Sequence, residues 1–315
     1  MQHYTNLNDI QNLDVIINKA IQLKRNPFQY KELGKNKTLI MLFFNASLRT
    51  RLSTEKAAKN LGMEVSILNI ANTWNIEFED GTKMNLNTSE HIKEAARVIS
   101  QYADIIAVRA FPTLTDKTKD LSEIIINSFK KYATIPIINM ESATDHPLQA
   151  LADGITLEEQ KTKKRPKVVL SWAPHPKALP HSVANSFIHL AKKINIDFMI
   201  THPPGYELDP TITGDIPILY NQKKALKDAD FVYAKNWSSF SNYGRVLHSN
   251  SSWMITNKTL GNAKFMHCLP IRRNIVAEDA VLDGMNSLVT EQANNRVYAA
   301  QVVLKKLLTQ KNEIK

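Results

Sequence analysis

Short apolar segments alternate with amphipathic segments along the whole chain, and this alternation restricts the fold more than any other feature of the sequence. In the first half, the apolar segments are Thr38–Phe44, Val65–Ile70, Asp104–Arg109 and Ile135–Met140. They are apolar at nearly every position, so both faces of each strand must be covered. Strands of this kind belong to parallel sheets with helices on both faces. The alternation therefore predicts an α/β protein.

Segments with a helical spacing of apolar residues separate these strands. We expect helices over residues 10–21, 48–61, 87–101, 121–131, 146–160 and 291–308. Asn87, with Glu90 three positions later, resembles a capping box for the third of these helices.

The alternation restarts after the basic segment 161–167. The strands expected in the second half are Lys167–Trp172, Phe198–Thr201, Ile216–Tyr220, Phe231–Lys235 and Lys264–Cys268. We therefore expect two doubly wound parallel-sheet domains, residues 1–140 and residues 141–290, with the C-terminal helix 291–315 packing back on the first. Ligands of such domains bind beyond the carboxyl ends of the strands, so we expect an active-site cleft between the domains.

Composition excludes several functional classes. The single cysteine, Cys268, cannot form an intrachain disulfide, and no apolar segment approaches the roughly 20 residues needed to cross a bilayer. We therefore expect a cytoplasmic protein that does not act at a membrane. The net charge is +10, but the densest basic segment, 161–167, has no interleaved aromatic residues. This favours a small anionic substrate over a nucleic acid.

The nine glycines exclude two nucleotide-binding motifs. The closest pair, Gly205 and Gly214, is nine positions apart, whereas a dinucleotide fingerprint and a Walker loop need much closer glycines. The nine histidines include no H-E-x-x-H pair, and one cysteine cannot form a thiolate cluster. We expect no metal and no cofactor. Any phosphate must be bound by side chains and a helix N-terminus.

The segment F-F-N-A-S-L-R-T-R predicts such a phosphate site. The apolar strand ends at Asn45, and a helix is expected to begin near Ser47. A helix N-terminus presents free N–H groups to an anion; Ser47 and Thr50 add hydroxyls, and the planar fork of Arg49 suits phosphate oxygens. The alternative is an ordinary serine cap followed by surface arginines, and the spacing alone does not decide between them.

Two further positions favour a site at the strand ends. His146-Pro147-Leu148-Gln149 follows the strand that ends near Met140, so His146 and Gln149 place a donor and an amide on one helical face. An isolated histidine is more often a capping or packing residue. Arg109 ends its own strand, where a charge suits a cleft better than a core.

Together these segments resemble the aspartate and ornithine carbamoyltransferase superfamily. Ser47-Leu48-Arg49-Thr50-Arg51 resembles its S-x-R-T-R carbamoyl phosphate loop, and 146–149 resembles its H-P-x-Q element. His267-Cys268-Leu269-Pro270 resembles the H-C-L-P of ornithine-type members. Arg296 resembles a late arginine that closes the phosphate site in this family. Four motifs in the family's order span nearly the whole chain.

The resemblance implies carbamoyl transfer from carbamoyl phosphate to an amine, without metal or cofactor. It implies that Ser47, Leu48, Arg49, Thr50 and Arg296 bind the phosphate. Thr50, Arg109 and His146 are then the catalytic donors to the carbonyl oxygen as it gains charge. Gln149 and the carbonyls of Cys268 and Leu269 are expected to hold the carbamoyl NH₂. The group that accepts the amine proton stays open, with the departing phosphate as one candidate.

The segment A-D-F-V-Y-A-K-N-W-S-S-F indicates which amine is attacked. Ornithine carbamoyltransferases have an aspartate there that pairs with the α-ammonium of ornithine, but this chain has Lys235. A lysine repels an ammonium and suits a substrate whose α-nitrogen is acylated, leaving only the α-carboxylate charged. The sequence therefore resembles the branch acting on N-succinylornithine or N-acetylornithine. A surface lysine is the alternative.

In that branch, the resemblance implies that Glu141, His175, Lys235 and Arg272 contact the acylated ornithine. It also implies a homotrimer, in which Trp74 reaches the active site of a neighbouring subunit, and a trefoil knot in the second domain. The chain after Lys235 is expected to pass through the proline-rich loop 173–180.

Two positions bear on the acyl group. Acetyl-specific members have a glutamate where this chain has Ser89, succinyl-specific members have a proline, and acetyl-type members have a lysine where this chain has Val276. With no acid at 89 and no lysine at 276, Arg272 stays available for a succinyl carboxylate, so N-succinylornithine is favoured. N-Acetylornithine is the alternative within the family. A knotted RNA methyltransferase is the alternative from another class, but it leaves 47–51 and 146–149 without a role.

Overall fold

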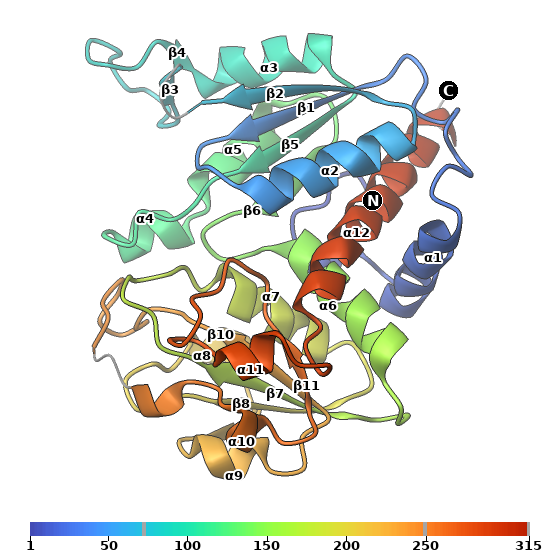
Figure 1. The fold of residues 1–315 in the computed structure, drawn as a ribbon. Helices are drawn as coiled ribbons and strands as arrows, with labels where there is room; N and C mark the ends of the chain where they lie inside the picture. Colours follow the sequence, from blue (N-terminus) through green and yellow to red (C-terminus); the bar gives the residue numbers. More distant parts are fainter. Residues whose placement is uncertain (71–73, 248–250, 314–315) are drawn as a thin grey trace. The chain divides into compact units, whose positions relative to one another are not determined.

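The chain divides into two compact units, each built on one parallel sheet (Figure 1). The computed structural model describes residues 1–70, 74–247 and 251–313. The first unit comprises Met1–Pro112, Thr118–Leu151 and Arg296–Lys315, and the second comprises Thr113–Lys117 and Ala152–Asn295. The two last residues of the expected C-terminal helix, 314 and 315, lie outside the described residues.

The sheet of the first unit contains four parallel strands in the order β2-β1-β5-β6. They are β1 (Thr38–Phe43), β2 (Glu64–Asn69), β5 (Ile105–Arg109) and β6 (Ile137–Glu141). All four were predicted to within two residues at each end. The central strands β1 and β5 and the edge strand β6 are buried along nearly their whole length, as consecutive apolar residues require.

Helices cover both faces of this sheet. Because β2 and β5 lie on opposite sides of β1, right-handed crossovers place their connecting helices on opposite faces. α2 (Leu48–Asn60) covers one face, and α3 (Ile92–Tyr102) and α5 (Ile124–Tyr132) cover the other, where their apolar residues share one core with β1 and β5. The first unit is therefore doubly wound, as predicted.

Two expected helices differ in the structure. The helix predicted from the capping box at Asn87 begins only at Ile92, with His91 as its N-cap. Residues 87–91 are not helical, because Ser89 N–H donates to the carbonyl of Asn75 (2.8 Å) and β4 (Glu90–His91) pairs with β3 (Ile76–Glu77).

The helix expected over 121–131 is interrupted. Glu123, with φ +50°, separates α4 (Lys117–Leu121) from α5. The left-handed backbone at this residue cannot continue a right-handed helix.

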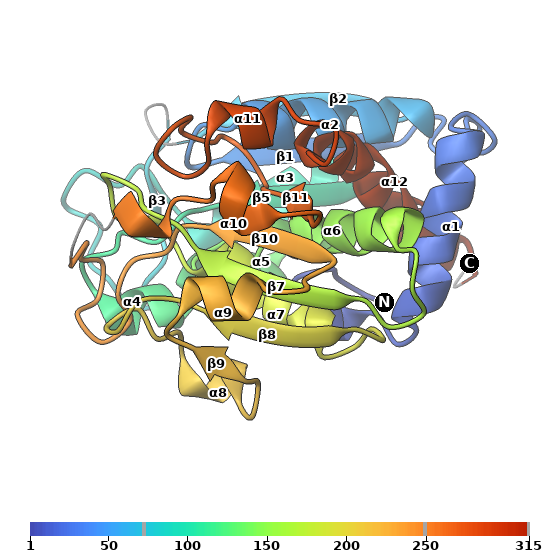
Figure 2. The same ribbon diagram turned by 60° about the horizontal axis from the view of Figure 1, so that its bottom comes forward.

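The sheet of the second unit contains five parallel strands in the order β11-β10-β7-β8-β9. They are β7 (Lys167–Trp172), β8 (Asp197–Thr201), β9 (Ile218–Leu219), β10 (Phe231–Lys235) and β11 (Lys264–Met266). β9 is shorter than expected and lies at the edge. α7 (Ser182–Ala191) lies behind the sheet in Figure 2. The other face is covered by the short helices α9 (Gln222–Leu226), α10 (Asn257–Leu260) and α11 (Asp279–Leu282), and α8 (Pro210–Thr213) follows β8.

Two helices contribute residues to both units. α6 (Pro147–Gln160) begins in the first unit, and α12 (Val289–Glu313) begins in the second and ends in the first. In the first unit, Gln301 of α12 accepts a hydrogen bond from Asn60 Nδ2 (3.0 Å) and donates to the carbonyl of Pro27, just beyond α1 (Leu13–Arg25).

The sequence placed the domain boundary after residue 140, whereas the structure groups 141–151 with the first unit. Two contacts give the reason: Tyr4 donates to the carbonyl of Pro147 (3.1 Å), and Ser142 donates to Glu123 (2.7 Å).

None of the described helices is long and apolar enough to cross a membrane.

Candidate active site

The predicted site residues of the first unit gather at the carboxyl edge of its sheet. Ser47 follows β1, Arg109 ends β5 and Glu141 ends β6. In the strand order β2-β1-β5-β6, the connections from β1 and β5 leave in opposite directions, so a crevice is expected between these two strand ends.

The N-terminus of α2 begins at the serine cap that the sequence predicted. Ser47 is extended, and its side chain accepts a hydrogen bond from Thr50 N–H (3.3 Å) as the N-cap. A pocket of about 500 Å³ opens beside this helix start and is lined by Asn45, Ser47 and Arg51, among others. The serine is thus a helix cap beside a pocket, and the pocket lining includes Ser47 and Arg51 of the predicted motif but not Arg49 or Thr50.

Thr50 joins two arginines that are far apart in the sequence. Its buried hydroxyl accepts from Arg296 Nη2 at 2.6 Å and from Arg109 Nη1 at 3.4 Å. A hydroxyl oxygen has two acceptor sites, so it can serve both guanidinium groups. The result is a buried concentration of positive charge within the first unit, which suits a phosphate dianion.

Arg109, Glu141 and His146 form a buried chain of polar contacts. Arg109 and Glu141 are paired in the register of β5 and β6, so their side chains emerge side by side. Arg109 Nη1 forms an ion pair with Glu141 Oε2, and the same oxygen lies 3.3 Å from His146 Nε2. The carboxylate therefore contacts two of the three groups, Arg109 and His146, that the resemblance assigned to the carbonyl oxygen.

Two residues that the sequence did not single out support Arg109. Its guanidinium carbon lies 4.3 Å from the centre of the Phe111 ring, a cation–π contact. Phe111 N–H donates to Asn45 Oδ1 (2.5 Å). Each residue lies two positions after the end of a strand, and this position was the only signal in the sequence that could have identified them.

His146 and Gln149 lie at the start of α6. Both are buried, and Gln149 N–H donates to the carbonyl of His146 (3.0 Å). His146 directly precedes the helix, which begins at Pro147. The helix start thus holds the backbone of the histidine while Glu141 contacts its ring.

In the second unit, too, predicted site residues lie at the carboxyl edge of the sheet. His175 follows β7, and Lys235 ends β10, the neighbouring strand where the strand order reverses. Lys235 is buried, and its ammonium donates to the carbonyl of Asn236 (2.7 Å). It is therefore not a surface lysine, which was the alternative interpretation.

His175 and Arg272 are in contact within the second unit. Arg272 Nε donates to His175 Nε2 (3.2 Å), and the other ring nitrogen lies 2.9 Å from the carbonyl of Lys177. Partial burial, together with the charges of Lys235, Arg272 and Lys177, lowers the pKa of His175 below its usual value. A neutral ring can accept from the arginine, so the geometry and the pKa agree.

A buried network that the sequence did not predict supports the loop of Cys268 and Leu269. Backbone N–H of His267 donates to Gln292 Oε1 (2.9 Å), and Gln292 Nε2 donates to Asp153 Oδ1 (2.6 Å). Leu269 N–H donates to His267 Nδ1 (2.9 Å). The carbonyls of Cys268 and Leu269, which were predicted to hold the carbamoyl NH₂, therefore belong to a loop that these hydrogen bonds hold in place.

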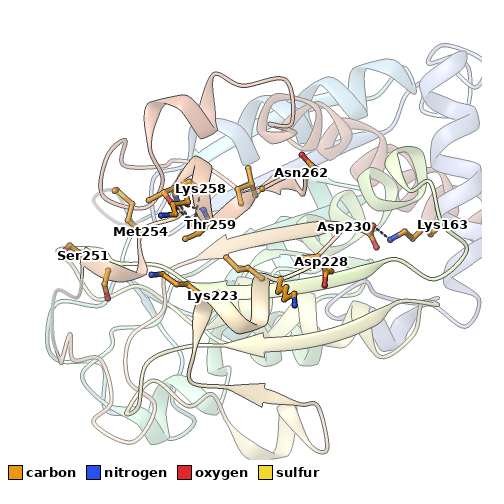
Figure 3. A pocket seen from close by; sticks show the side chains of 16 residues that line it. Lys163, Lys223, Asp228, Asp230, Ser251, Met254, Lys258, Thr259 and Asn262 are labelled. Carbon is orange, nitrogen blue, oxygen red and sulfur yellow. Dashed lines mark hydrogen bonds and ion pairs between the residues drawn. The ribbon is translucent and has the colours of Figure 1, made fainter.

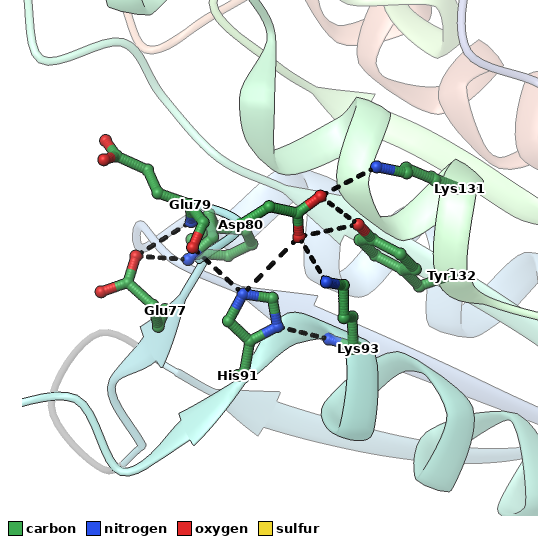
Figure 4. A network of polar contacts seen from close by, with 8 residues as sticks. Glu77, Glu79, Asp80, His91, Lys93, Lys131 and Tyr132 are labelled. Carbon is green, nitrogen blue, oxygen red and sulfur yellow. Dashed lines mark hydrogen bonds and ion pairs between the residues drawn. The ribbon is translucent and has the colours of Figure 1, made fainter. Parts of the chain in front are cut away.

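Trp74 and Ser89 belong to the segment 74–91, which includes β3 and β4. Trp74 packs partly buried against the core of the first unit, and Ser89 is exposed. Asp80 anchors this segment through Lys93 (2.9 Å), Lys131 (3.1 Å) and Tyr132 (Figure 4). Hydrogen bonds from Lys93, Tyr132 and Lys131 lower the pKa of the Asp80 carboxyl far below its usual value.

A second pocket, of about 870 Å³, lies at the amino ends of β7 and β10 in the second unit (Figure 3). Lys163, ion-paired with Asp230 (2.7 Å), and Thr259 are among its lining residues. Of the described residues that line it, none is a predicted site residue. In the described ranges, no three histidine, cysteine or acidic side chains are grouped to hold a metal ion.

Family models match both halves of the chain. Residues 2–159 match the aspartate/ornithine carbamoyltransferase carbamoyl-P binding domain, and residues 180–307 match the Asp/Orn binding domain of the same family. N-Succinylornithine carbamoyltransferase of Bacteroides fragilis is 46% identical over 98% of this chain and 99% of that protein. N-Acetylornithine carbamoyltransferase of Xylella fastidiosa is 36% identical, with the same coverage.

Solved structures agree with these relatives. N-Acetyl-L-ornithine transcarbamylase variants in which alanine or serine replaces one glutamate were solved with carbamyl phosphate and N-succinyl-L-norvaline. Each matches with a TM-score of 0.91 at 35% identity, over 98% of this chain and 100% of that chain. The fold, the two family models and the full-length relatives lead to one conclusion: this chain is a carbamoyltransferase and belongs to the aspartate/ornithine carbamoyltransferase family.

Proposed function

We propose that the protein transfers the carbamoyl group of carbamoyl phosphate to the δ-amine of N-succinyl-L-ornithine, giving N-succinyl-L-citrulline and phosphate in arginine biosynthesis. The observation that carries this proposal is the buried Lys235 at the end of β10. A buried ammonium there opposes a second ammonium and attracts a carboxylate, so it favours an ornithine whose α-nitrogen is acylated.

Carbamoyl phosphate is bound mainly by the first unit in this proposal. Ser47, Arg49 and the N–H groups at the start of α2 bind the phosphate, together with Arg296. Thr50, Arg109 and His146 donate to the carbonyl oxygen of the substrate. Gln149 and the carbonyls of Cys268 and Leu269 accept from the carbamoyl NH₂. These groups are held by fixed partners, so little reorganisation is needed as charge develops.

The reaction follows from this arrangement. The neutral δ-amine attacks the carbonyl carbon, a C–N bond forms, and the carbonyl oxygen gains negative charge that Arg109, Thr50 and His146 stabilise. The C–O bond to phosphate then breaks, and the leaving phosphate takes the electron pair. The amine loses a proton, for which the departing phosphate is a suitable acceptor. Most of the acceleration comes from positioning and electrostatics.

The acylated ornithine is bound by Lys235, His175 and Arg272 of the second unit and by Glu141 in our proposal. Lys235 takes the α-carboxylate, and Arg272 takes the distal carboxylate of the succinyl group. His175 orients Arg272 by accepting its Nε–H. Because the side chain of Arg272 is exposed apart from this contact, it can reach a ligand without breaking a buried pair.

Ser89 is the position that we propose selects the acyl group. In the acetyl-type enzyme, replacement of one glutamate by serine gives a protein that holds N-succinyl-L-norvaline. We infer that Ser89 stands where that glutamate stands. A serine removes the negative charge that repels the succinyl carboxylate, which supports succinylornithine as the substrate.

N-Acetylornithine remains the second candidate, because acetyl-type relatives are 36% identical over almost the whole chain. The deciding experiment measures kcat/KM for ornithine, N-acetylornithine and N-succinylornithine with carbamoyl phosphate, following citrulline products. We expect succinylornithine to give the highest kcat/KM. A preference for acetylornithine would reject the succinyl assignment, and a preference for ornithine would reject the role of Lys235. Filter binding to bulk RNA tests the alternative of an RNA-binding methyltransferase, and we expect no salt-sensitive binding.

We also propose a cytoplasmic homotrimer in which Trp74 reaches a neighbouring active site. The proposed knot is supported by contacts between the loop after β7 and the chain after β10: Ser238 N–H donates to the carbonyl of Leu179 (3.0 Å), and Asn236 Nδ2 donates to that of Ala173 (2.9 Å). Sedimentation equilibrium tests the trimer, and Trp74→Ala tests the shared site through a loss of activity with retained assembly.

A further inference from the structure

Glu123 has a backbone conformation that the proposed reaction does not explain. It lies between α4 and α5 with φ +50° and ψ +37°. Residues other than glycine, asparagine and aspartate rarely adopt this left-handed region. Such a conformation persists only where the surrounding contacts hold it, so its contacts should reveal its role.

The carboxylate of Glu123 does not cap its own helix. Although Glu123 is the N-cap residue of α5, its side chain makes no capping hydrogen bond. One oxygen, Oε1, instead accepts from Ser142 Oγ (2.7 Å), Thr144 N–H (2.6 Å) and Thr144 Oγ1 (2.6 Å). The left-handed turn therefore aims the carboxylate at another segment, the loop 142–146 between β6 and α6.

That loop connects the two residues that contact each other at the carbonyl site. Glu141 directly precedes the loop, and His146 ends it, with 3.3 Å between Glu141 Oε2 and His146 Nε2. Within the loop, Ser142 N–H donates to the carbonyl of Asp145 (2.8 Å), and Ser142 Oγ accepts from Asn139 Nδ2 (2.9 Å). Thr144 is only two residues from His146, so a shift of Thr144 moves the imidazole.

An acceptor is needed at the centre of this loop. Three donors converge on one oxygen, and a carboxylate accepts several hydrogen bonds without bringing a donor of its own. Burial raises the pKa of the Glu123 carboxyl, and the hydrogen bonds from Thr144 and Ser142 act in the opposite direction by favouring the charged form. The hydrogen bonds that order the loop 142–146 therefore also hold the partly buried carboxylate of Glu123 in place.

We propose that Glu123 is a positioning residue for catalysis: by holding Ser142 and Thr144, it fixes the loop that places the imidazole of His146 against Glu141. The inference rests on the role of His146 proposed above. The role proposed for Glu123 needs no contact with either substrate. Its effect passes through the loop, and displacement of a catalytic group by about 1 Å can cost on the order of 100-fold in rate.

The test compares kcat and KM of the wild type with those of Glu123→Gln, Thr144→Val and the double variant. We expect each single variant to lower kcat at least tenfold, while KM for carbamoyl phosphate changes less than threefold, because the phosphate-binding groups of α2 lie on another element. The double variant should be little worse than the poorer single variant, because both changes weaken the same contact: glutamine removes the charge of the acceptor, and valine removes the hydroxyl donor of Thr144.

Matched variants separate the possible results. Glu32→Gln, an exposed residue that pairs only loosely with Lys35 (3.8 Å), should keep the wild-type kcat. Folded Glu123→Gln and Thr144→Val proteins with wild-type kcat, or losses that multiply in the double variant, would overturn the inference. If Glu123→Gln does not fold, Thr144→Val and Ser142→Ala decide in the same way. His146→Gln with wild-type kcat would instead reject the proposed site itself.

Discussion

Glu141 Oε2 is shared by Arg109 and His146, so a single buried oxygen links the ends of two strands to the start of α6. The pairing follows from the register, in which Arg109 and Glu141 are opposite each other on neighbouring parallel strands. Neither charge is stable in that position alone, because burying an isolated ion is costly. The pair holds the guanidinium in one orientation, which a preorganised carbonyl site requires.

The first prediction concerns Glu141. Replacement by alanine leaves the Arg109 guanidinium buried without its carboxylate, and we expect a loss of about 3–5 kcal/mol in the free energy of unfolding, measured by urea denaturation. The double variant Arg109→Met with Glu141→Leu should recover most of this stability but have no measurable carbamoyl transfer. A double variant as unstable as Glu141→Ala would show that the pair is not the cause.

The second prediction concerns phosphate binding at the start of α2. Arg49→Ala removes a charge-assisted contact, which is worth roughly 1.5–3 kcal/mol, so we expect the Kd for carbamoyl phosphate to rise about 10- to 100-fold. Isothermal titration calorimetry measures this Kd. Lys59→Ala is the control, since Lys59 is near the far end of the same helix and pairs with Glu55 (2.6 Å). Equal affinities of the two variants would contradict the assigned phosphate site.

The strands could be predicted because a strand that is buried on both faces has apolar residues at consecutive positions, and such segments are visible in the sequence. The start of the helix expected from Asn87 was wrong, because the backbone of Ser89 bonds to a distant partner, Asn75, and the helix begins only at Ile92. A local capping pattern cannot show such a partner. The non-helical conformation of residues 87–91 is therefore set by tertiary contacts, which local propensity does not encode.

The placement of Arg109 and Lys235 at the carboxyl ends of strands could be predicted, because parallel strands present these ends at one edge of the sheet. The contacts between site residues that are distant in the sequence could not be predicted. Thr50 and Arg296 are in contact across 246 positions of sequence, and Arg109 and Glu141 meet at an irregularity in the register of β5 and β6. Glu123 gave no signal at all, because its role depends on a left-handed backbone that the sequence pattern did not indicate.

The third prediction concerns the pH dependence of stability at His175. Its pKa is below the usual 6.5 because of partial burial and nearby cations, so the unfolded chain binds the proton more readily. Its contribution to stability is therefore complete above about pH 6.5 and declines as the pH falls below that value. Between pH 8 and pH 5.5, the wild type should lose more unfolding free energy than His175→Asn.

Other histidines do not obscure this comparison. The pKa values of His3, His181 and His202 are also lowered by burial, but these residues are present in both proteins, and their contributions cancel in the difference. Parallel stability curves for the wild type and His175→Asn would contradict the prediction. They would mean that the ring takes up its proton equally readily in the folded and unfolded chains.

The last prediction concerns the choice of acyl group. Ser89→Glu places a carboxylate in the segment that we propose faces the acyl group, where it repels the distal carboxylate of a succinyl substrate but not an uncharged acetyl methyl. We expect kcat/KM for N-succinylornithine to fall by about 100-fold or more, since like charges juxtaposed at a binding site cost several kcal/mol. For N-acetylornithine, kcat/KM should stay within a few fold or rise. Ser89→Gln is the matched control, because it adds the same bulk without the charge and should keep the succinyl preference. If Ser89→Gln and Ser89→Glu shift the preference equally, size and not charge decides the acyl group at this position, and the electrostatic basis of the succinyl assignment fails.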